Sequence, residues 1–258
     1  MKKYIALTAL LAAGSAFANA TALDDLLADY NSTGGWNLSF GSEYEGGYEL
    51  TGTMTKKGTF WDVIPVEGGT QTNGNKRVHM AGGVYGSWAD DFQLEISLTL
   101  GDTITASNNW PVFAEIAGNG TSLRFGPYTN AGNYVSLDGT LTKNFTDTNF
   151  SVTGGETYTV TLVKIGADVS LYVGGTLVST GTFPYIEEKE GKIVEHPLPT
   201  GNITDIALGG NTGGSYRINE VVHSVSYKTL TLIPEPSTFG LLAGLGALAL
   251  VGTRRRRK

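Results

Sequence analysis

Residues 157–179 read TYTVTLVKIGADVSLYVGGTLVS, and this stretch decides the fold class. Its first nine residues alternate in the manner of a strand with one buried face. The residues that share this face are Tyr158, Val160, Leu162 and, through its aliphatic stem, Lys164. The turn residues GAD at 166–168 and GG at 174–175 separate this run from two more short runs, at 169–173 and 176–179. The pattern predicts antiparallel strands joined by tight turns.

The same pattern continues along most of the chain. Residues 91–100 (DFQLEISLTL) alternate cleanly between apolar and polar side chains, which predicts a half-buried strand. Further strands are predicted at 110–116, 121–125, 133–137, 203–208 and 218–232. Short strands with Gly and Asn between them and no run of βαβ units predict an all-β fold, an antiparallel β-sandwich or barrel.

Two segments depart from the strand pattern. Residues 21–30 carry Leu and Tyr at helical spacing with Thr21 as the N-cap, which predicts a short N-terminal helix that ends at the polar, Gly-rich stretch 31–35. Residues 183–200 are charged and bounded by Pro, and they are predicted to form a long loop or an exposed hairpin.

The composition excludes several classes of protein. The chain has 258 residues, 36 of them Gly, and no Cys. Without Cys there can be no disulfide scaffold, thiolate metal site or cysteine nucleophile. No fixed-period repeat occurs, which argues against a propeller or solenoid. The many Gly residues suit a fold with many turns.

Each end of the chain carries a targeting signal. Residues 1–20 show a basic start, an apolar run and the small residues Ala18-Asn19-Ala20, as in a secretory signal peptide cleaved after Ala20, with Ala18 as the alternative site. At the other end, Pro234-Glu235-Pro236 precedes the uncharged segment 239–251. This predicted hydrophobic helix is shorter than the usual membrane span. Five basic residues follow it and are expected on the cytoplasmic side: Arg254, Arg255, Arg256, Arg257 and Lys258.

The order Pro-Glu-Pro, hydrophobic helix and Arg cluster closely resembles the PEP-CTERM sorting signal of Gram-negative bacteria. The resemblance implies passage through the secretion machinery, a transient membrane anchor, recognition by an exosortase-type membrane enzyme and release or attachment at the cell surface. Proteins of this kind are often associated with exopolysaccharide and biofilm matrix. The predicted domains are therefore a signal peptide (1–20), a β-sandwich (21–233) and a sorting tail (234–258).

The charge of the central domain excludes one class of partner. Residues 21–233 contain 11 basic and 23 acidic residues, a net charge of −12. Such a surface repels nucleic acid and anionic lipid. No nucleic-acid partner is therefore expected.

Two segments of the central domain resemble laminin-G-like, concanavalin A-like jelly rolls. The first is 156–179, although Gly174 stands where Asp is common in that family, and the second is 206–225, which includes Arg217-Ile218-Asn219-Glu220-Val221. The resemblance covers about residues 90–232 and implies a concanavalin A-like jelly roll. Lectins, adhesion modules, glycoside hydrolases and polysaccharide lyases all use this fold, so the fold does not decide the function.

The sequence offers one candidate catalytic pair. A retaining glycosidase needs two carboxylates about 5–5.5 Å apart. Asp91 and Glu95 share one face of the strand at 91–100, but two solvent-facing acids are the simpler interpretation. No Gly-x-Ser-x-Gly motif occurs, and none of the three His residues is marked as a base, although a lyase with a His or Tyr base stays open.

Binding residues are also suggested. Four aromatic residues in Gly/Asn-rich stretches or at strand starts could stack on sugar rings, with core packing as the alternative. They are Trp61, Tyr85, Trp88 and Trp110. No cofactor is expected, and a structural calcium ion is the alternative. Several Asp residues lie at strand ends, where carboxylate oxygens can converge, and Asp90 and Asp102 are the metal candidates.

Three hypotheses follow for the function. The first is an exported, non-catalytic module that binds a glycan or matrix at the cell surface. The second is a polysaccharide-degrading enzyme, a hydrolase or lyase on the same fold. The third is a structural matrix protein with no defined ligand.

Overall fold

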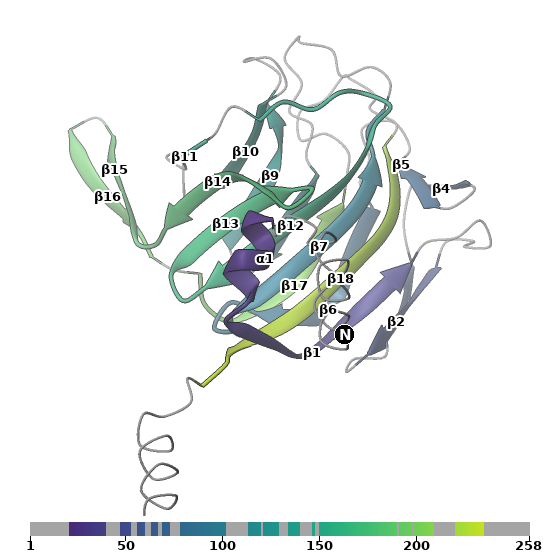
Figure 1. Cartoon of the computed structure of the whole chain (residues 1–258), viewed down its shortest axis with the longest axis horizontal. Helices are drawn as coiled ribbons and strands as arrows, with labels where there is room; N and C mark the ends of the chain where they lie inside the picture. Colours follow the sequence, from purple (N-terminus) through teal and green to yellow (C-terminus); the bar gives the residue numbers. More distant parts are fainter. Residues whose placement is uncertain are drawn as a thin grey trace, which may run out of the picture.

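The computed structural model describes residues 21–39, 47–52, 56–59, 63–66, 69–72, 78–101, 113–119, 121–128, 134–139, 146–147, 150–189, 191–197, 199–208 and 220–234. Within these residues the chain forms antiparallel sheets and one short helix, so the all-β prediction is confirmed. Two of the sheets stack as a sandwich, with the helix lying on the outside (Figure 1).

The large sheet runs, in spatial order, through β11 (Thr146–Asp147), β14 (Thr176–Thr182), β13 (Asp168–Val173), β12 (Thr157–Ile165), β7 (Phe92–Thr99), β18 (Val221–Leu232), β1 (Tyr30–Ser39), β2 (Gly47–Gly52) and β3 (Lys56–Thr59). Two further strands, β4 (Val63–Val66) and β5 (Gly69–Thr72), join it through β18. The small sheet runs through β10 (Tyr134–Gly139), β9 (Thr121–Tyr128), β8 (Ala114–Gly118), β17 (Asn202–Leu208) and β6 (Val78–Ser87). A separate hairpin contains β15 (Tyr185–Lys189) and β16 (Lys192–His196).

The main core lies between the two sheets. The apolar residues of the predicted alternating strand, now β7, all point into it: Phe92, Leu94, Ile96 and Leu98 are buried. Ile206 and Leu208 of β17 come from the facing sheet. The period-2 pattern of the sequence therefore identified the inner face of this strand correctly.

Strand β12 is buried on both faces, although its sequence suggested only one. Val160 and Leu162 enter the main core, and Val163 enters a second apolar cluster on the outer face of the large sheet. This outer cluster consists of Val163, Tyr172 and Leu230, with Leu23, Leu26, Leu27, Tyr30, Ile165 and Leu177 packed against it. The helix α1 (Ala22–Leu27) covers this outer cluster, which explains the second buried face.

The N-terminal prediction needs a correction. The helix ends at Leu27, a turn follows at residues 28–29, and Tyr30 and the stretch predicted to stop the helix belong to β1, which pairs with β18. Gly35 permits this pairing: its φ is +143°, and a Cβ there would lie 1.9 Å from the carbonyl oxygen of Tyr227. The helical spacing of Leu and Tyr was therefore misleading at its last residue, because pairing with a long central strand decides the conformation from Tyr30 onward.

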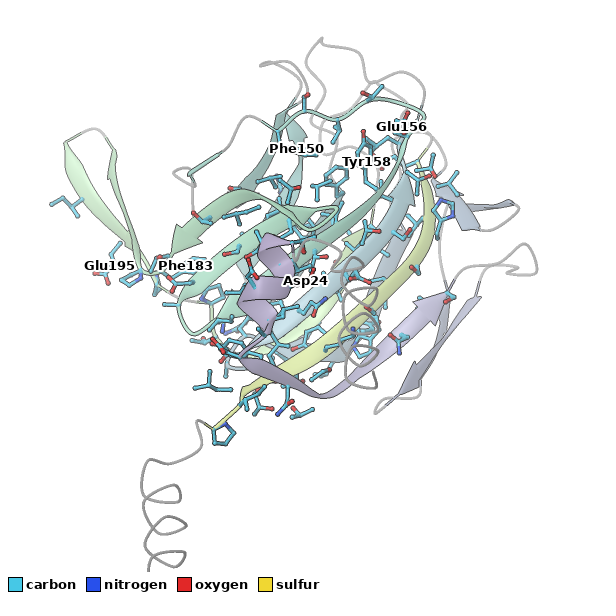
Figure 2. All side chains as sticks on the ribbon, in the orientation of Figure 1. Asp24, Phe150, Glu156, Tyr158, Phe183 and Glu195 are labelled. Carbon is cyan, nitrogen blue, oxygen red and sulfur yellow. The ribbon has the colours of Figure 1, made fainter. Side chains whose placement is uncertain are left out.

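The charged insertion at 183–200 forms the hairpin β15–β16, as one of the two predicted alternatives stated. The hairpin projects from the body of the sandwich (Figure 1), and Figure 2 shows Glu195 on it. At its base Phe183 is buried, and the amide of Phe183 donates to the carbonyl of Ala167 at 2.9 Å.

The other predicted strands match observed ones, with shifted ends. Residues 110–112 and 218–219 lie outside the described residues, and so do the signal peptide and residues 235–258 with the predicted C-terminal helix. In the part of the chain that the structure describes, no helix is long and apolar enough to cross a membrane. The proposed domain boundaries stay predictions.

Candidate functional site

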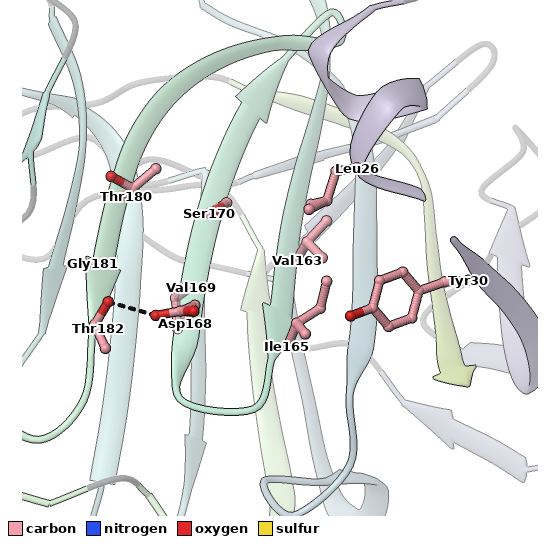
Figure 3. A pocket seen from close by; sticks show the side chains of 10 residues that line it. All are labelled: Leu26, Tyr30, Val163, Ile165, Asp168, Val169, Ser170, Thr180, Gly181 and Thr182. Atoms are coloured by element: carbon pink, nitrogen blue, oxygen red, sulfur yellow. Dashed lines mark hydrogen bonds between the residues drawn. The ribbon is translucent and has the colours of Figure 1, made fainter. Parts of the chain in front are cut away.

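A cavity of about 310 Å³ lies on the outer face of the large sheet, beside α1 (Figure 3). Its base is formed by three consecutive strands, β12, β13 and β14, that the tight turns of residues 157–179 place side by side. The residues that line it are Leu26, Tyr30, Val163, Ile165, Asp168, Val169, Ser170, Thr180, Gly181 and Thr182. Residues 157–179 thus supply five of these ten lining residues.

Strand register explains why apolar and polar groups meet here. Across β13 and β14, Asp168 pairs with Thr182 and Ser170 pairs with Thr180, so these four polar side chains share one face. On the neighbouring strand β12, Ile165 pairs with Asp168 and Val163 with Ser170. The cavity therefore has an apolar side next to a row of hydroxyl groups and one carboxylate.

The wall opposite β14 comes from the N-terminal segment. Leu26 reaches the cavity from α1 and Tyr30 from the start of β1, and Figure 3 shows the Tyr30 hydroxyl pointing toward Ile165. Helix α1 is held to the sheet by its apolar contacts and by the amide of Leu23, which donates to the carbonyl of Gly175 at 3.3 Å. Docked α1 therefore supplies part of one wall of the cavity.

Among the described residues that line the cavity, Asp168 is the one that carries a charge, and it is held in place. The hydroxyl of Thr182 donates to Asp168 Oδ1 at 2.5 Å, as the dashed line in Figure 3 marks. Asp168 is exposed, and a carboxylate has room for several further hydrogen bonds. The pKa of Tyr30 is raised, mainly by loss of solvation and to a lesser extent by the negative charges of Asp91 and Asp29. The hydroxyl of Tyr30 therefore stays protonated and can donate a hydrogen bond.

The predicted catalytic pair lies on the same sheet, one strand away. Asp91 directly precedes β7 and its Oδ1 accepts a hydrogen bond from the amide of Gly166 at 2.6 Å, which ties it to the β12–β13 turn. Glu95 lies further along β7, between Thr161 of β12 and Ser226 of β18. A rise of about 3.3 Å per residue separates the two Cα atoms by about 13 Å. This spacing and the turn contact do not favour a glycosidase pair.

Two of the predicted sugar-stacking residues are in the core instead. Tyr85 and Trp88 are buried, with 0% and 1% of their surface exposed. The Tyr85 ring packs edge-on against Trp36 and the Trp88 ring against Phe92. The prediction of an exposed platform is therefore wrong for both, because a sandwich of this size needs large side chains to fill the space between its sheets. Trp61 and Trp110 lie outside the described residues.

The metal candidates receive no support from the described residues. The hydrogen bonds observed for Asp90 are made by its backbone. Its amide donates to the carbonyl of Ser87 at 3.2 Å, and its carbonyl accepts from Lys164 Nζ at 2.9 Å. Asp102 lies outside the described residues. In the described part of the chain, no three His, Asp or Glu side chains gather in a way that could hold a metal ion. A structural calcium ion stays a prediction.

Sequence reasoning missed the cavity. Asp168 stood out only as a turn acid, and the hydroxyl residues of β14 carried no motif. The signal that was present is the alternation Asp168, Ser170 on one strand and Thr180, Thr182 on the next, which becomes a polar row only once the register is known. The apolar wall contributed by α1 could not be foreseen, because no local pattern says on which strands the helix docks.

The sorting tail is identified by comparison with known families. A family model described as the PEP-CTERM protein-sorting motif matches residues 232–257. The match includes Pro234, Glu235, Pro236 and the Arg cluster 254–257, and it ends one residue before Lys258. Of these residues only Pro234 is among the described ones, and it is exposed. The chain is thus a β-sandwich protein with a PEP-CTERM sorting motif, which implies export, processing by an exosortase-type system and sorting to the surface.

Solved structures are similar in fold. One similar chain belongs to the solved structure titled "Cell entry of botulinum neurotoxin type C is dependent upon interaction with two ganglioside molecules". The sequence identity is 14% and the TM-score is 0.51, and the match covers 81% of this chain and 50% of that chain. This protein also resembles a mutant of Trypanosoma rangeli sialidase displaying trans-sialidase activity. The sequence identity is 17% and the TM-score is 0.50, and the match covers 78% of this chain and 31% of that chain. The chain spans 30% of the Trypanosoma rangeli sialidase chain. No curated protein matches it. At these identities the likeness shows only that the fold is a jelly-roll-like sandwich, and it carries no information about activity.

Proposed function

We propose that this protein is displayed at the cell surface and binds a glycan of the extracellular matrix without cleaving it. The observation that carries the proposal is the cavity beside α1, where an apolar side faces a row of hydroxyl groups and one oriented carboxylate. A sugar ring has the matching two characters, because its CH groups are apolar and its hydroxyl groups both donate and accept.

The sorting motif gives this binding a location. Because proteins with this kind of tail are often associated with exopolysaccharide and biofilm matrix, such a polysaccharide is the proposed partner. The net charge of −12 in residues 21–233 supports the exclusion of nucleic acid.

The enzyme alternative has less support. The carboxylate of Asp91 accepts the Gly166 amide, and about 13 Å of extended backbone lies between Asp91 and Glu95. Neither acid is among the residues that line the cavity. A purely structural role is the third alternative, and it predicts no saturable ligand.

One experiment separates the three functions. The full chain is tested on a glycan array, and each glycan that it binds is then incubated with it and assayed for new reducing ends or unsaturated products. We expect saturable binding and no products. Turnover that Glu95→Gln abolishes would establish the enzyme, and the absence of any binding would leave the structural role.

A further inference from the structure

We propose that the cavity between α1, β12, β13 and β14 is the glycan site and that it selects a pyranose ring carrying an amino group, as in a de-N-acetylated hexosamine polymer. This inference rests on the proposed function and names its site and ligand class.

The size and lining suit one or two sugar rings. About 310 Å³ is at the lower end of the range for small-ligand pockets. The side chains of Leu26, Val163 and Ile165 offer an apolar surface to the CH face of a ring. Ser170 and Thr180, which are opposite each other in the register, offer hydroxyl groups at its edge.

The charge of the cavity decides between kinds of sugar. Among the ten described lining residues, Asp168 is the one ionised group and none is basic. The carboxylates of Asp91 and Asp29 act on Tyr30, so further negative charge lies near that wall of the cavity, although the buried Lys164 also interacts with Asp91. A uronic or sialic acid would be repelled, whereas an ammonium group gains a charge-assisted hydrogen bond to the carboxylate.

Asp168 is positioned to make that bond. Thr182 fixes the carboxylate through Oδ1, at 2.5 Å, and the side chain is exposed to solvent at the cavity. The Tyr30 hydroxyl, on the other side of the cavity, stays protonated and can donate to a ring oxygen (Figure 3). An amino sugar placed between them would have both its cationic and its neutral polar groups satisfied.

The test compares matched oligosaccharides on the full chain. Glucosamine oligomers, N-acetylglucosamine oligomers of the same length and an oligouronate are titrated by calorimetry at low and at 0.5 M salt. We expect the glucosamine oligomer to bind at least about tenfold more tightly than the other two, with a preference that weakens as salt rises. Equal binding of the two hexosamine oligomers, or tighter binding of the oligouronate, would overturn the ligand class.

Variants test the site. Asp168→Asn keeps the size of the side chain, and we expect it to lower the affinity for the glucosamine oligomer about tenfold or more. Thr182→Val removes the hydroxyl that orients Asp168 and should lower the affinity by a smaller factor. Glu195→Gln, on the projecting hairpin, removes one exposed negative charge elsewhere and should leave the affinity unchanged (Figure 2).

The outcomes separate this inference from the proposed function. Each variant is first checked by thermal unfolding, so that a loss of binding is not confused with a loss of fold. Glycan binding that Asp168→Asn and Thr182→Val leave unchanged would overturn the site and keep the proposed function. No binding of any glycan by the full chain would overturn both.

Discussion

Tyr227 lies at the centre of the aromatic core. Its ring stacks on Trp36 at 6.0 Å and on Phe92 at 5.2 Å, and burial raises the pKa of its hydroxyl. Gly86 lies against the same ring, and a Cβ at Gly86 would be 2.4 Å from Tyr227 Cζ. Because two rings confine Tyr227, it has little space to move away.

We therefore predict that Gly86→Ala lowers the free energy of unfolding by about 1–3 kcal/mol through overpacking. Urea denaturation monitored by fluorescence measures this change. Gly174→Asn is the control, since a Cβ there meets nothing within 4 Å and Asn tolerates the positive φ of +56°. A loss for Gly86→Ala no larger than for the control would contradict the packing argument.

Trp88 provides a second test at the residue scale. It is buried against Phe92, and its Nε1 has no hydrogen-bond partner among the described residues. Trp88→Ala should destabilise the protein by about 3–5 kcal/mol, as for other buried large aromatic residues. Trp88→Phe should cost clearly less, because it keeps most of the ring and loses no hydrogen bond.

These variants are compared by thermal unfolding and by the glycan titration. We expect Trp88→Phe to keep the affinity of the parent chain, since Trp88 does not line the cavity. A Trp88→Phe protein that is stable but no longer binds glycan would restore the stacking role that the sequence suggested.

At the scale of the element, α1 is a short helix that depends on its cap and its contacts. The amide and hydroxyl of Thr21 donate to Asp24 Oδ2 at 2.9 and 2.8 Å, and the Asp24 amide donates to Thr21 Oγ1 at 3.2 Å. These bonds form a capping box. The cap lies against the β13–β14 turn, where a Cβ on Gly175 would come within 2.7 Å of the Thr21 side chain.

The cap has a pH dependence with a definite sign. The hydrogen bonds from the backbone and side chain of Thr21 lower the pKa of Asp24 below its ordinary value of 3.8. The cap is therefore complete above pH 3.8 and is lost as the pH falls through the lower pKa of the folded state. An NMR titration of the Asp24 carboxyl carbon should give a midpoint below 3.8.

Thr21→Ala should move the Asp24 midpoint back toward 3.8 and weaken the docking of α1 by about 0.5–2 kcal/mol. Hydrogen exchange of the amides of α1 measures the docking. An unchanged midpoint in Thr21→Ala would show that the capping box does not cause the shift.

The helix also shows where local patterns stop being informative. Thr21 as N-cap was predictable, because a Thr followed by Asp three residues later is a local signal. The end of the helix was not predictable. Tyr30 fits the helical spacing, and yet it belongs to β1 and pairs with Leu232 of β18. The long-range pairing prevails because it adds a whole ladder of hydrogen bonds to a buried strand.

At the scale of the whole molecule, the sorting tail and the sandwich are separate in sequence. Deletion of residues 234–258 should release the exported protein into the medium without any need for exosortase, because the hydrophobic segment and its terminal cations are removed. Cell fractionation and immunoblotting measure this outcome.

The matched control replaces Pro234, Glu235 and Pro236 by Ala and keeps the hydrophobic segment. This variant should stay in the membrane fraction as an unprocessed chain. If the deletion changes neither localisation nor processing, the tail is not the sorting determinant.

Local sequence patterns were enough to predict the fold class, the inner face of β7 and the sorting tail, and they limited residues 183–200 to a long loop or an exposed hairpin. Each of these depends on neighbouring residues: strand alternation, turn residues, a local charge run and a linear motif that a membrane enzyme reads. The tertiary structure alone decided that Tyr85 and Trp88 are core residues, that α1 covers the outer cluster and that Asp168 faces a cavity. The reason is physical, since burial and the lining of a cavity depend on which strands and helices pack together, and the residues concerned are far apart in the chain.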